Sequence, residues 1–149
     1  QVKKLNAEET TVFSLHGDGE LQEGQIWEAA MYAAHHKVDN LISFVDCNGQ
    51  QIDGPTDEVM GLGDLAQKWT AFGWRVHVCD GHDFDALRTA VTTSREARGS
   101  GVPQVVLMKT AMGKGVDFME GTHEWHGIAP NDDQLASALG QLDETLGDY

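Results

Sequence analysis

A short turn, Gly17-Asp18-Gly19, separates an apolar run from a long Ala-rich segment, and this order constrains the fold more than any other feature of the chain. The run 11–15 has the composition of a buried strand, and the segment that begins near Gly24 has that of a helix. Glycines let the backbone turn tightly and approach a ligand, and a helix N-terminus offers unpaired N–H groups to an anion. Strand, glycine turn and helix together predict a phosphate site.

The turn carries an acidic side chain where that anion would bind. Asp18 lies inside it, and Glu20 and Glu23 follow closely. These carboxylates would repel a bare phosphate unless a cation lay between them. We therefore expect a metal ion to bridge the turn and a phosphorylated ligand.

A second strand follows the helix and ends in polar residues. Segment 25–38 is apolar almost throughout, which is typical of a helix covered on most sides, and segment 41–45 is a short apolar run of the kind found in parallel sheets. The right-handed crossover of such a βαβ unit puts both strand ends at one edge of the sheet. We therefore expect Asp18 and Asn48 to lie close together.

The rest of the chain continues the alternation of strands and helices. The expected elements are a long, functional loop or partly ordered excursion at 50–63, a helix at 64–72, an edge strand at 74–79, a helix at 83–98, a buried strand at 103–108, an irregular glycine-rich stretch at 110–130 and a helix from 131 onward. This order predicts a doubly wound, mostly parallel α/β sheet with helices on both faces. We expect a single diphosphate-binding domain over residues 1–149, and the opening without Met indicates a fragment of a longer chain.

The composition excludes several classes of partner. Ten Lys and Arg against 24 Asp and Glu give a net charge of −14, which argues against nucleic acids and anionic membranes. The chain has no apolar run long enough to span a membrane and no signal peptide at its start. Its two cysteines, Cys47 and Cys79, are isolated, which favours a reducing compartment, so we expect a cytoplasmic protein.

Two common phosphate motifs do not match. After Gly17 and Gly19 the next glycine is Gly24, so the spacing of a dinucleotide-binding fingerprint fails, and Asp18 would face the pyrophosphate directly. A Walker A loop also fails, because segment 113–115 lacks the spaced glycine before it and the Ser or Thr after it. A metal-bridged diphosphate remains, and Asp18 and Asn48 supply the oxygen ligands that Mg²⁺ prefers.

The motifs of the chain resemble those of transketolases. The thiamine diphosphate motif of that family is matched by Gly17-Asp18-Gly19 and by the stretch 46–54, in which Asn48 lies thirty positions after Asp18. Finer similarity lies in segments 20–28, 80–83, 114–120 and 125–127. The resemblance covers nearly the whole chain and is to the N-terminal, diphosphate-binding subunit of split-gene transketolases.

The resemblance implies a role for each matching residue. Asp18 and Asn48 would ligate Mg²⁺ by their side chains and Gln50 by its backbone oxygen, with Ca²⁺ or Mn²⁺ as substitutes. Gly17 and Gly19 would approach the diphosphate. The other assignments it implies are cofactor contacts by Ile52, Met112 and His126, a catalytic role for His126 at the reacting sugar, and interface carboxylates that connect paired active sites at Glu23 and Glu28.

The implied activity is transfer of a two-carbon ketol unit from a ketose phosphate to an aldose phosphate, as in the pentose phosphate pathway. The implied partner is a separate C-terminal, pyrimidine-binding subunit in a hetero-oligomer, because the activating glutamate of the family belongs to that half. Three alternatives stay open, and one of them is an orphan nucleotide-binding, flavodoxin-like module that would fold without cofactor and would not depend on Mg²⁺. The chain could belong to another thiamine diphosphate enzyme with a different substrate, or to a non-catalytic, Mg-diphosphate-binding regulatory subunit.

The residues themselves also allow structural interpretations. Asp18 alone would be an Asx-type cap, and its interpretation as a ligand depends on Asn48 at the matching strand end. Glu23 and Glu28 would favour a helix N-terminus through the helix dipole, although Glu28 in an apolar helix suggests a buried carboxylate. Without the resemblance, His126 would be a packing residue.

Two further groups carry weaker expectations. His123 and His126 lack the spacing of a helical zinc motif, so zinc is not expected. Four leucines near the C-terminus follow helical spacing and are expected in the core, the alternative being that they dock on the partner chain: Leu135, Leu139, Leu142 and Leu146.

Overall fold

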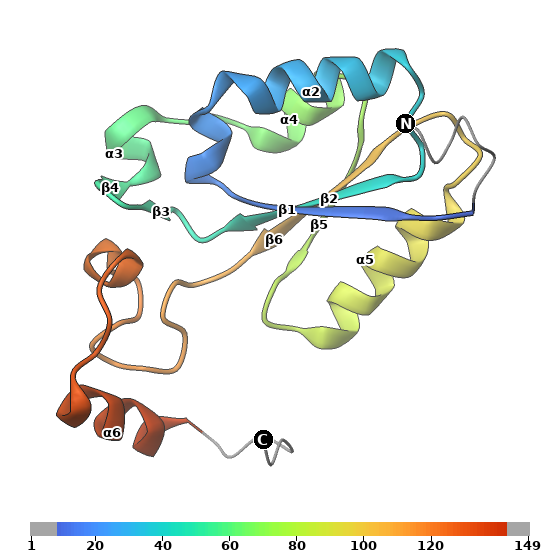
Figure 1. The fold of residues 1–149 in the computed structure, drawn as a ribbon. Helices are drawn as coiled ribbons and strands as arrows, with labels where there is room; N and C mark the ends of the chain where they lie inside the picture. Colours follow the sequence, from blue (N-terminus) through green and yellow to red (C-terminus); the bar gives the residue numbers. More distant parts are fainter. Residues whose placement is uncertain (1–8, 143–149) are drawn as a thin grey trace.

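The structure, a computed structural model, describes residues 9–142 and contains one parallel sheet with helices on both faces (Figure 1). The strands of this sheet are β1 (Val12–Gly17), β2 (Leu41–Cys47), β6 (Gln104–Lys109) and β5 (Arg75–Asp80), in that spatial order. The main helices are α2 (Gly24–His35), α4 (Leu65–Ala71), α5 (Phe84–Glu96) and α6 (Asp132–Gln141). All three strand pairings are parallel, which confirms the predicted fold class.

The central strands are buried on both sides because helices cover both faces. In β6, Val105 and Leu107 pack into the core cluster under α2 and α4, whereas Val106 packs with Ala90 of α5 on the opposite face. Figure 1 shows α2 and α4 on one side of the sheet and α5 on the other. This two-sided burial explains why β2 and β6 have continuous apolar sequences.

The outer strands are less well covered. The segment 74–79 was expected at an edge, and β5 does lie at one edge of the sheet. β1 occupies the other edge of the described sheet, and its Phe13 and Leu15 are 52% and 69% exposed. These two side chains therefore lie on a part of the sheet that the described helices leave largely open, although the Phe13 ring contacts that of Phe44 on β2 at 6.0 Å between centroids.

The segment 50–63 is more regular than the sequence predicts. It contains a short antiparallel hairpin, formed by β3 (Gln50–Gln51) and β4 (Gly54–Pro55), and the one-turn helix α3 (Thr56–Met60). The amide of Thr56 donates to the carbonyl of Gly49 across the base of the hairpin. This pairing satisfies backbone groups that an open loop would leave to water.

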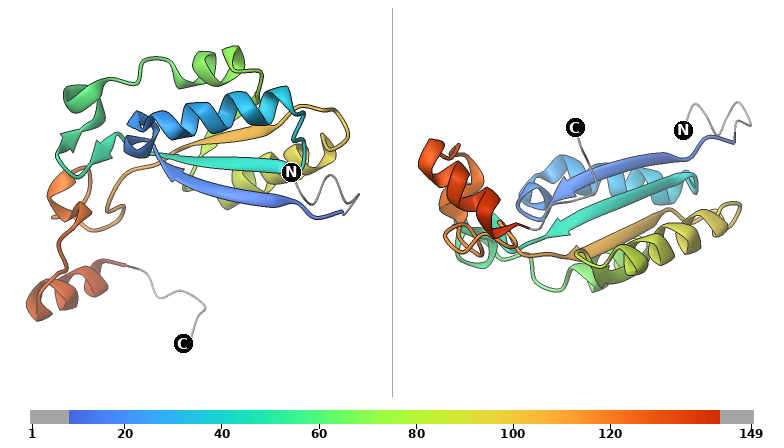
Figure 2. Two further views of the ribbon diagram at one scale, coloured as in Figure 1. Left: turned by 45° about the horizontal axis from the view of Figure 1, so that its top comes forward. Right: turned by 90° about the horizontal axis from the view of Figure 1, so that it is seen from below.

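The C-terminal leucines do not enter the core of the described structure. Helix α6 lies apart from the layered part of the molecule (Figures 1 and 2), and Leu135, Leu139 and Leu142 are 46%, 63% and 46% exposed. The helix is attached through Gln141, whose amide exchanges two hydrogen bonds with Asp117 at 2.8 and 2.9 Å. The expectation of a core role was wrong for these three leucines, and Leu146 lies outside the described residues.

Helix α2 is also less covered than expected. Ala30 and Ala33 are buried against the sheet, but Met31 and Tyr32 are 53% and 52% exposed. Within residues 9–142, the outer face of α2 carries no further layer of structure. None of the described helices is long and apolar enough to cross a membrane.

Candidate functional site at the carboxyl edge of the sheet

The Asp18 side chain joins the ends of two neighbouring strands. Asp18 follows β1, caps the short 3-10 helix η1 (Gly19–Gln22) and is only 5% exposed. Its Oδ1 accepts the amide of Gly19 at 2.9 Å, and its Oδ2 accepts the amide of Gly49, in the loop after β2, at 2.8 Å. The backbone amide of Asp18 donates to the carbonyl of Asp46 at 3.0 Å. The predicted meeting of the two strand ends is therefore present.

The environment of Asp18 opposes its negative charge. Burial raises the pKa of its carboxyl above the ordinary value, the amides of Gly49 and Gly19 partly offset this effect, and the charge of Asp46 raises the pKa further. Within the described part of the chain, no lysine, arginine or histidine is among the groups that shift this pKa. A divalent cation beside the carboxylate would favour its ionised form, so the donor chemistry fits a metal.

Asn48 is oriented by a residue that the sequence did not single out. Asp46 Oδ2 accepts from the Asn48 side-chain amide at 3.2 Å, and Asn48 Oδ1 accepts the amide of Gln50 at 2.8 Å. Asp46 Oδ1 also accepts the hydroxyl of Thr110, from the loop after β6. Asp46 thus links three chain segments, and the signal available in the sequence was the Asp-x-Asn pattern at the end of a buried strand.

The two glycines of the turn differ in the space around them. A Cβ at Gly19 would lie 2.5 Å from Cβ of Gln51 in β3, so the turn packs directly against the hairpin and only glycine fits. A Cβ at Gly17 would meet nothing within 4 Å. Gly17 therefore faces open space that a ligand can approach, whereas the requirement at Gly19 is explained by the fold.

The remaining proposed cofactor contacts lie in loops at the same edge. Ile52, at the tip of the β3–β4 hairpin, is 64% exposed, and its Cδ1 is 3.8 Å from the position of a Cβ built on Gly127. Gly127 directly follows the 3-10 helix η2 (His123–His126), which contacts both strands of the hairpin, and His126 is exposed at the end of η2. Met112 is half-buried in the loop after β6, where its carbonyl accepts the amide of Gly121 at 2.9 Å.

The two carboxylates expected at an interface, Glu23 and Glu28, lie at the start of α2 rather than in the Asp18 cluster. Glu23 precedes the helix as its N-terminal flanking residue and makes no side-chain capping bond, and Glu28 lies one turn further on. Both are exposed. The suggestion of a buried Glu28 was wrong for the described chain, because its side of α2 is not covered by any described element.

Two further side chains near this edge are explained locally. Cys47 has its pKa raised to about 12, by burial first and then by the charges of Asp18 and Asp46, so it is a neutral thiol rather than a thiolate ligand. Lys114 is exposed, and its Nζ lies 3.7 Å from Oε1 of Glu120. In residues 9–142, no three His, Cys, Asp or Glu side chains form a group that could hold a metal ion.

The fold and the edge cluster define a class of protein: a parallel α/β domain whose carboxylate and amide oxygens gather where the strands end, the position at which such sheets bind ligands. The family model described as "Transketolase, thiamine diphosphate binding domain" matches residues 3–144. The chain belongs to this transketolase family.

Named relatives and solved structures agree with this assignment. The chain is 42% identical over 134 residues to a 6-deoxy-6-sulfo-D-fructose transketolase subunit of Clostridium sp. (strain MSTE9), with 90% of this chain and 48% of the relative covered. It is 41% identical over 139 residues to an apulose-4-phosphate transketolase subunit of Actinobacillus succinogenes, covering 93% of this chain and 49% of that protein. The chain thus spans about half the length of these curated relatives.

Among solved structures, transketolase from Campylobacter jejuni superimposes with a TM-score of 0.80 at 30% sequence identity. The match covers 89% of this chain and 20% of that one. The fold described above is therefore that of a segment of transketolase.

Proposed function

We propose that this chain is the diphosphate- and Mg²⁺-binding part of a transketolase that moves a two-carbon ketol unit from a ketose phosphate to an aldose phosphate. The observation that carries the proposal is the buried Asp18 carboxylate, which accepts the amide of Gly49, the residue after Asn48, and has no cationic group among the described residues that shift its pKa. Membership of the thiamine diphosphate-binding family supplies the identity of the ligand. Thiamine diphosphate, when bound, supplies the nucleophile and the electron sink of the reaction.

The residues of the chain would divide the binding between them. Asp18, the amide oxygen of Asn48 and the backbone oxygen of Gln50 would hold the metal, with Asp46 fixing the orientation of Asn48. Gly17 would allow close approach of the diphosphate, because nothing lies within 4 Å of the position that a Cβ would take there. Ile52 and Met112 would contact the cofactor ring, and His126 would contact the diphosphate and the sugar.

The chain would act with a second, pyrimidine-binding polypeptide. Two relatives that span about twice the matched length are named as transketolase subunits, which supports a split enzyme. Glu23 and Glu28, exposed on α2, would lie at the subunit interface and connect paired sites. We expect the isolated chain to be inactive and to bind the cofactor weakly, because the other half of the site would come from that partner.

The metal site is tested by titrating thiamine diphosphate into the chain by calorimetry, with and without Mg²⁺ and with and without a co-expressed partner. We expect Mg²⁺-dependent binding that tightens with the partner. Asp18→Ala should abolish the Mg²⁺ dependence, whereas Asp57→Ala, which removes an exposed carboxylate on α3, should leave it unchanged. Tight binding by Asp18→Ala without Mg²⁺ would contradict the metal assignment.

The activity needs its own measurement. With the partner present, the chain should transfer a ketol unit between sugar phosphates, and analysis of the sugar phosphate products measures this transfer. Cofactor binding without any ketol transfer, over a panel of ketose and aldose phosphates, would instead favour the regulatory alternative.

A further inference from the structure

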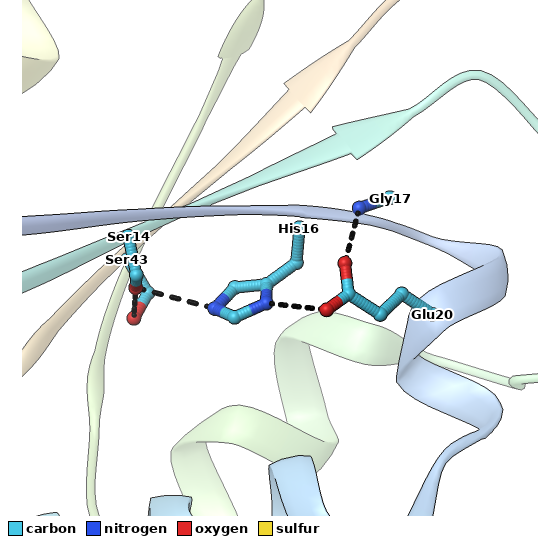
Figure 3. Close-up of polar contacts among 5 residues, drawn as sticks. All are labelled: Ser14, His16, Gly17, Glu20 and Ser43. Carbon is cyan, nitrogen blue, oxygen red and sulfur yellow. Dashed lines mark hydrogen bonds and ion pairs between the residues drawn. The ribbon is translucent and has the colours of Figure 1, made fainter.

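The carboxylate of Glu20 folds back over the turn that contains Asp18. Its Oε2 accepts the backbone amide of Gly17 at 3.3 Å, and its Oε1 lies 3.4 Å from Nδ1 of His16 (Figure 3). Glu20 lies in η1, directly after Gly19. One side chain therefore closes the turn across the two residues that precede Asp18.

The amide of Gly17 needs an acceptor because β1 is an edge strand of the described sheet. Alternate residues of a parallel strand donate to the same neighbour, and the amide of Asp18 donates to Asp46 of β2. The amide of Gly17 points away from β2, and Glu20 supplies its acceptor. The bond thus fixes the last residue of β1 at the point where the chain leaves the sheet.

Glu20 is held by a line of polar contacts that starts inside the sheet. Ser43 of β2 is buried, and its Oγ lies 2.8 Å from Oγ of Ser14, its register partner on β1. Ser14 Oγ lies 3.2 Å from Nε2 of His16, which completes the connection to Glu20. Figure 3 shows these side chains in one row below β1. The side chain of His16 is 18% exposed and that of Glu20 is 48% exposed, so the row runs from the interior to the surface.

We infer that Glu20 is a positioning residue for the metal–diphosphate site and that His16, supported by Ser14 and Ser43, holds it in place. The inference rests on the proposed function and adds a residue that ligates nothing itself. The direction in which cofactor affinity changes when Glu20 is removed separates this positioning role from a simple charge effect. A carboxylate close to a diphosphate repels it, so removing Glu20 would strengthen binding if charge alone mattered. Removal weakens binding if Glu20 shapes the turn.

Two substitutions distinguish these effects. Glu20→Ala removes both the charge and the acceptor for Gly17, whereas Glu20→Gln removes the charge and keeps an acceptor oxygen. Glu96→Ala, on the exposed end of α5, is a matched control for the change in net charge. The readouts are the dissociation constant of thiamine diphosphate with Mg²⁺, by calorimetry on the full chain with its partner, and amide hydrogen exchange at Gly17, by NMR without ligand.

We expect Glu20→Ala to weaken binding about tenfold, the size of one lost hydrogen bond to a charged group, and to speed exchange at Gly17. Glu20→Gln should bind within about twofold of the original chain or more tightly, with little change in exchange. His16→Ala should give a smaller loss than Glu20→Ala, because the bond to Gly17 survives. Glu96→Ala should match the original chain in both measurements.

The results that overturn the inference differ from those that overturn the proposed function. If the original chain binds the cofactor and Glu20→Ala binds it equally or more tightly, Glu20 does not position the site and the proposed function stands. Unchanged exchange at Gly17 in Glu20→Ala overturns the inference in the same way. If the original chain shows no Mg²⁺-dependent binding, the proposed function fails and the inference fails with it.

Discussion

At the scale of a single residue, the fold disfavours the negative charge of the Asp18 carboxylate. Its carboxylate is buried between two strand ends, where burial raises its pKa and two backbone amides offset only part of that effect. A capping aspartate on the surface has no such conflict, as Asp64 at the start of α4 shows, because its hydrogen bonds with Gln67 lower its pKa. The difference between the two caps supports the metal interpretation of Asp18.

The two free cysteines provide a test of burial near the site. Burial is the main cause of a raised thiol pKa at both cysteines. The pKa of Cys47 rises to about 12, and the charge of Asp18 is the next cause. The pKa of Cys79 is also raised, and there the charge of Asp80 is the next cause. Because only the thiolate reacts, we expect thiol-specific reagents at pH 8 to label Cys47 of the folded chain at least a hundredfold more slowly than in urea. The rate should rise about tenfold for each pH unit.

The same pKa shifts determine how the stability of the fold changes with pH. The folded-state pKa values lie above the ordinary thiol value of 9.0, so ionisation opposes folding. The stability associated with neutral thiols is present below about pH 9 and is lost as the pH rises toward 12.

In the labelling experiment, a Cys47→Ser variant is the control, because its labelling reports Cys79 alone. Equal labelling rates for Cys47 in the folded and the unfolded chain would contradict the assigned burial.

At the scale of elements, the site depends on the contact between η1 and the β3–β4 hairpin. Gly19→Ala would place a methyl group 2.5 Å from Cβ of Gln51, so one element must shift. We expect a loss of about 1–3 kcal/mol in the free energy of unfolding, measured by urea denaturation, as for other overpacked sites.

Gly17→Ala is the control for this contact. No atom lies within 4 Å of the added methyl and Gly17 does not have a positive φ, so stability should change by less than about 0.5 kcal/mol. Cofactor affinity should nevertheless fall if the diphosphate approaches Gly17. An equal loss of stability in the two variants would contradict the close packing of Gly19 against the hairpin.

At the scale of the whole molecule, large apolar side chains are exposed on several separate elements. Met31 on α2, Leu139 on α6 and Leu15 on β1 are each more than half exposed. A contiguous exposed apolar patch, rather than a single side chain, indicates contact with further protein structure, and on α2 the neighbouring Met31 and Tyr32 are 53% and 52% exposed. Helix α2 also carries Glu28, which we propose lies at the subunit interface, so we expect α2 to contact the proposed partner.

We expect Met31→Glu to weaken association with the proposed pyrimidine-binding partner at least tenfold, because a charge would be buried in the interface. Analytical ultracentrifugation of the mixed chains measures this. Val78→Glu on the edge strand β5, with nearly the same exposure of 51% against 53%, is the matched control and should leave association unchanged. Stronger disruption by Val78→Glu would place the interface at β5 instead.

The sequence by itself determined the parallel sheet, the order of its elements and the meeting of Asp18 with the end of β2. These follow from local patterns and from the fixed hand of the βαβ crossover, which leaves little choice of topology. The motif spacing was sufficient to indicate the family.

Only the tertiary structure decided what surrounds those residues. The packing of Gly19 on Gln51 depends on a contact between segments far apart in the sequence. The bonds of Asp46 to Asn48 and of Glu20 to Gly17 are local, but they depend on turn conformations that the residue pattern does not show. Helical spacing likewise could not place α6, because it shows that a face is apolar but not whether anything in the same chain covers it. Periodicity determines the elements, and contacts across the fold determine the site.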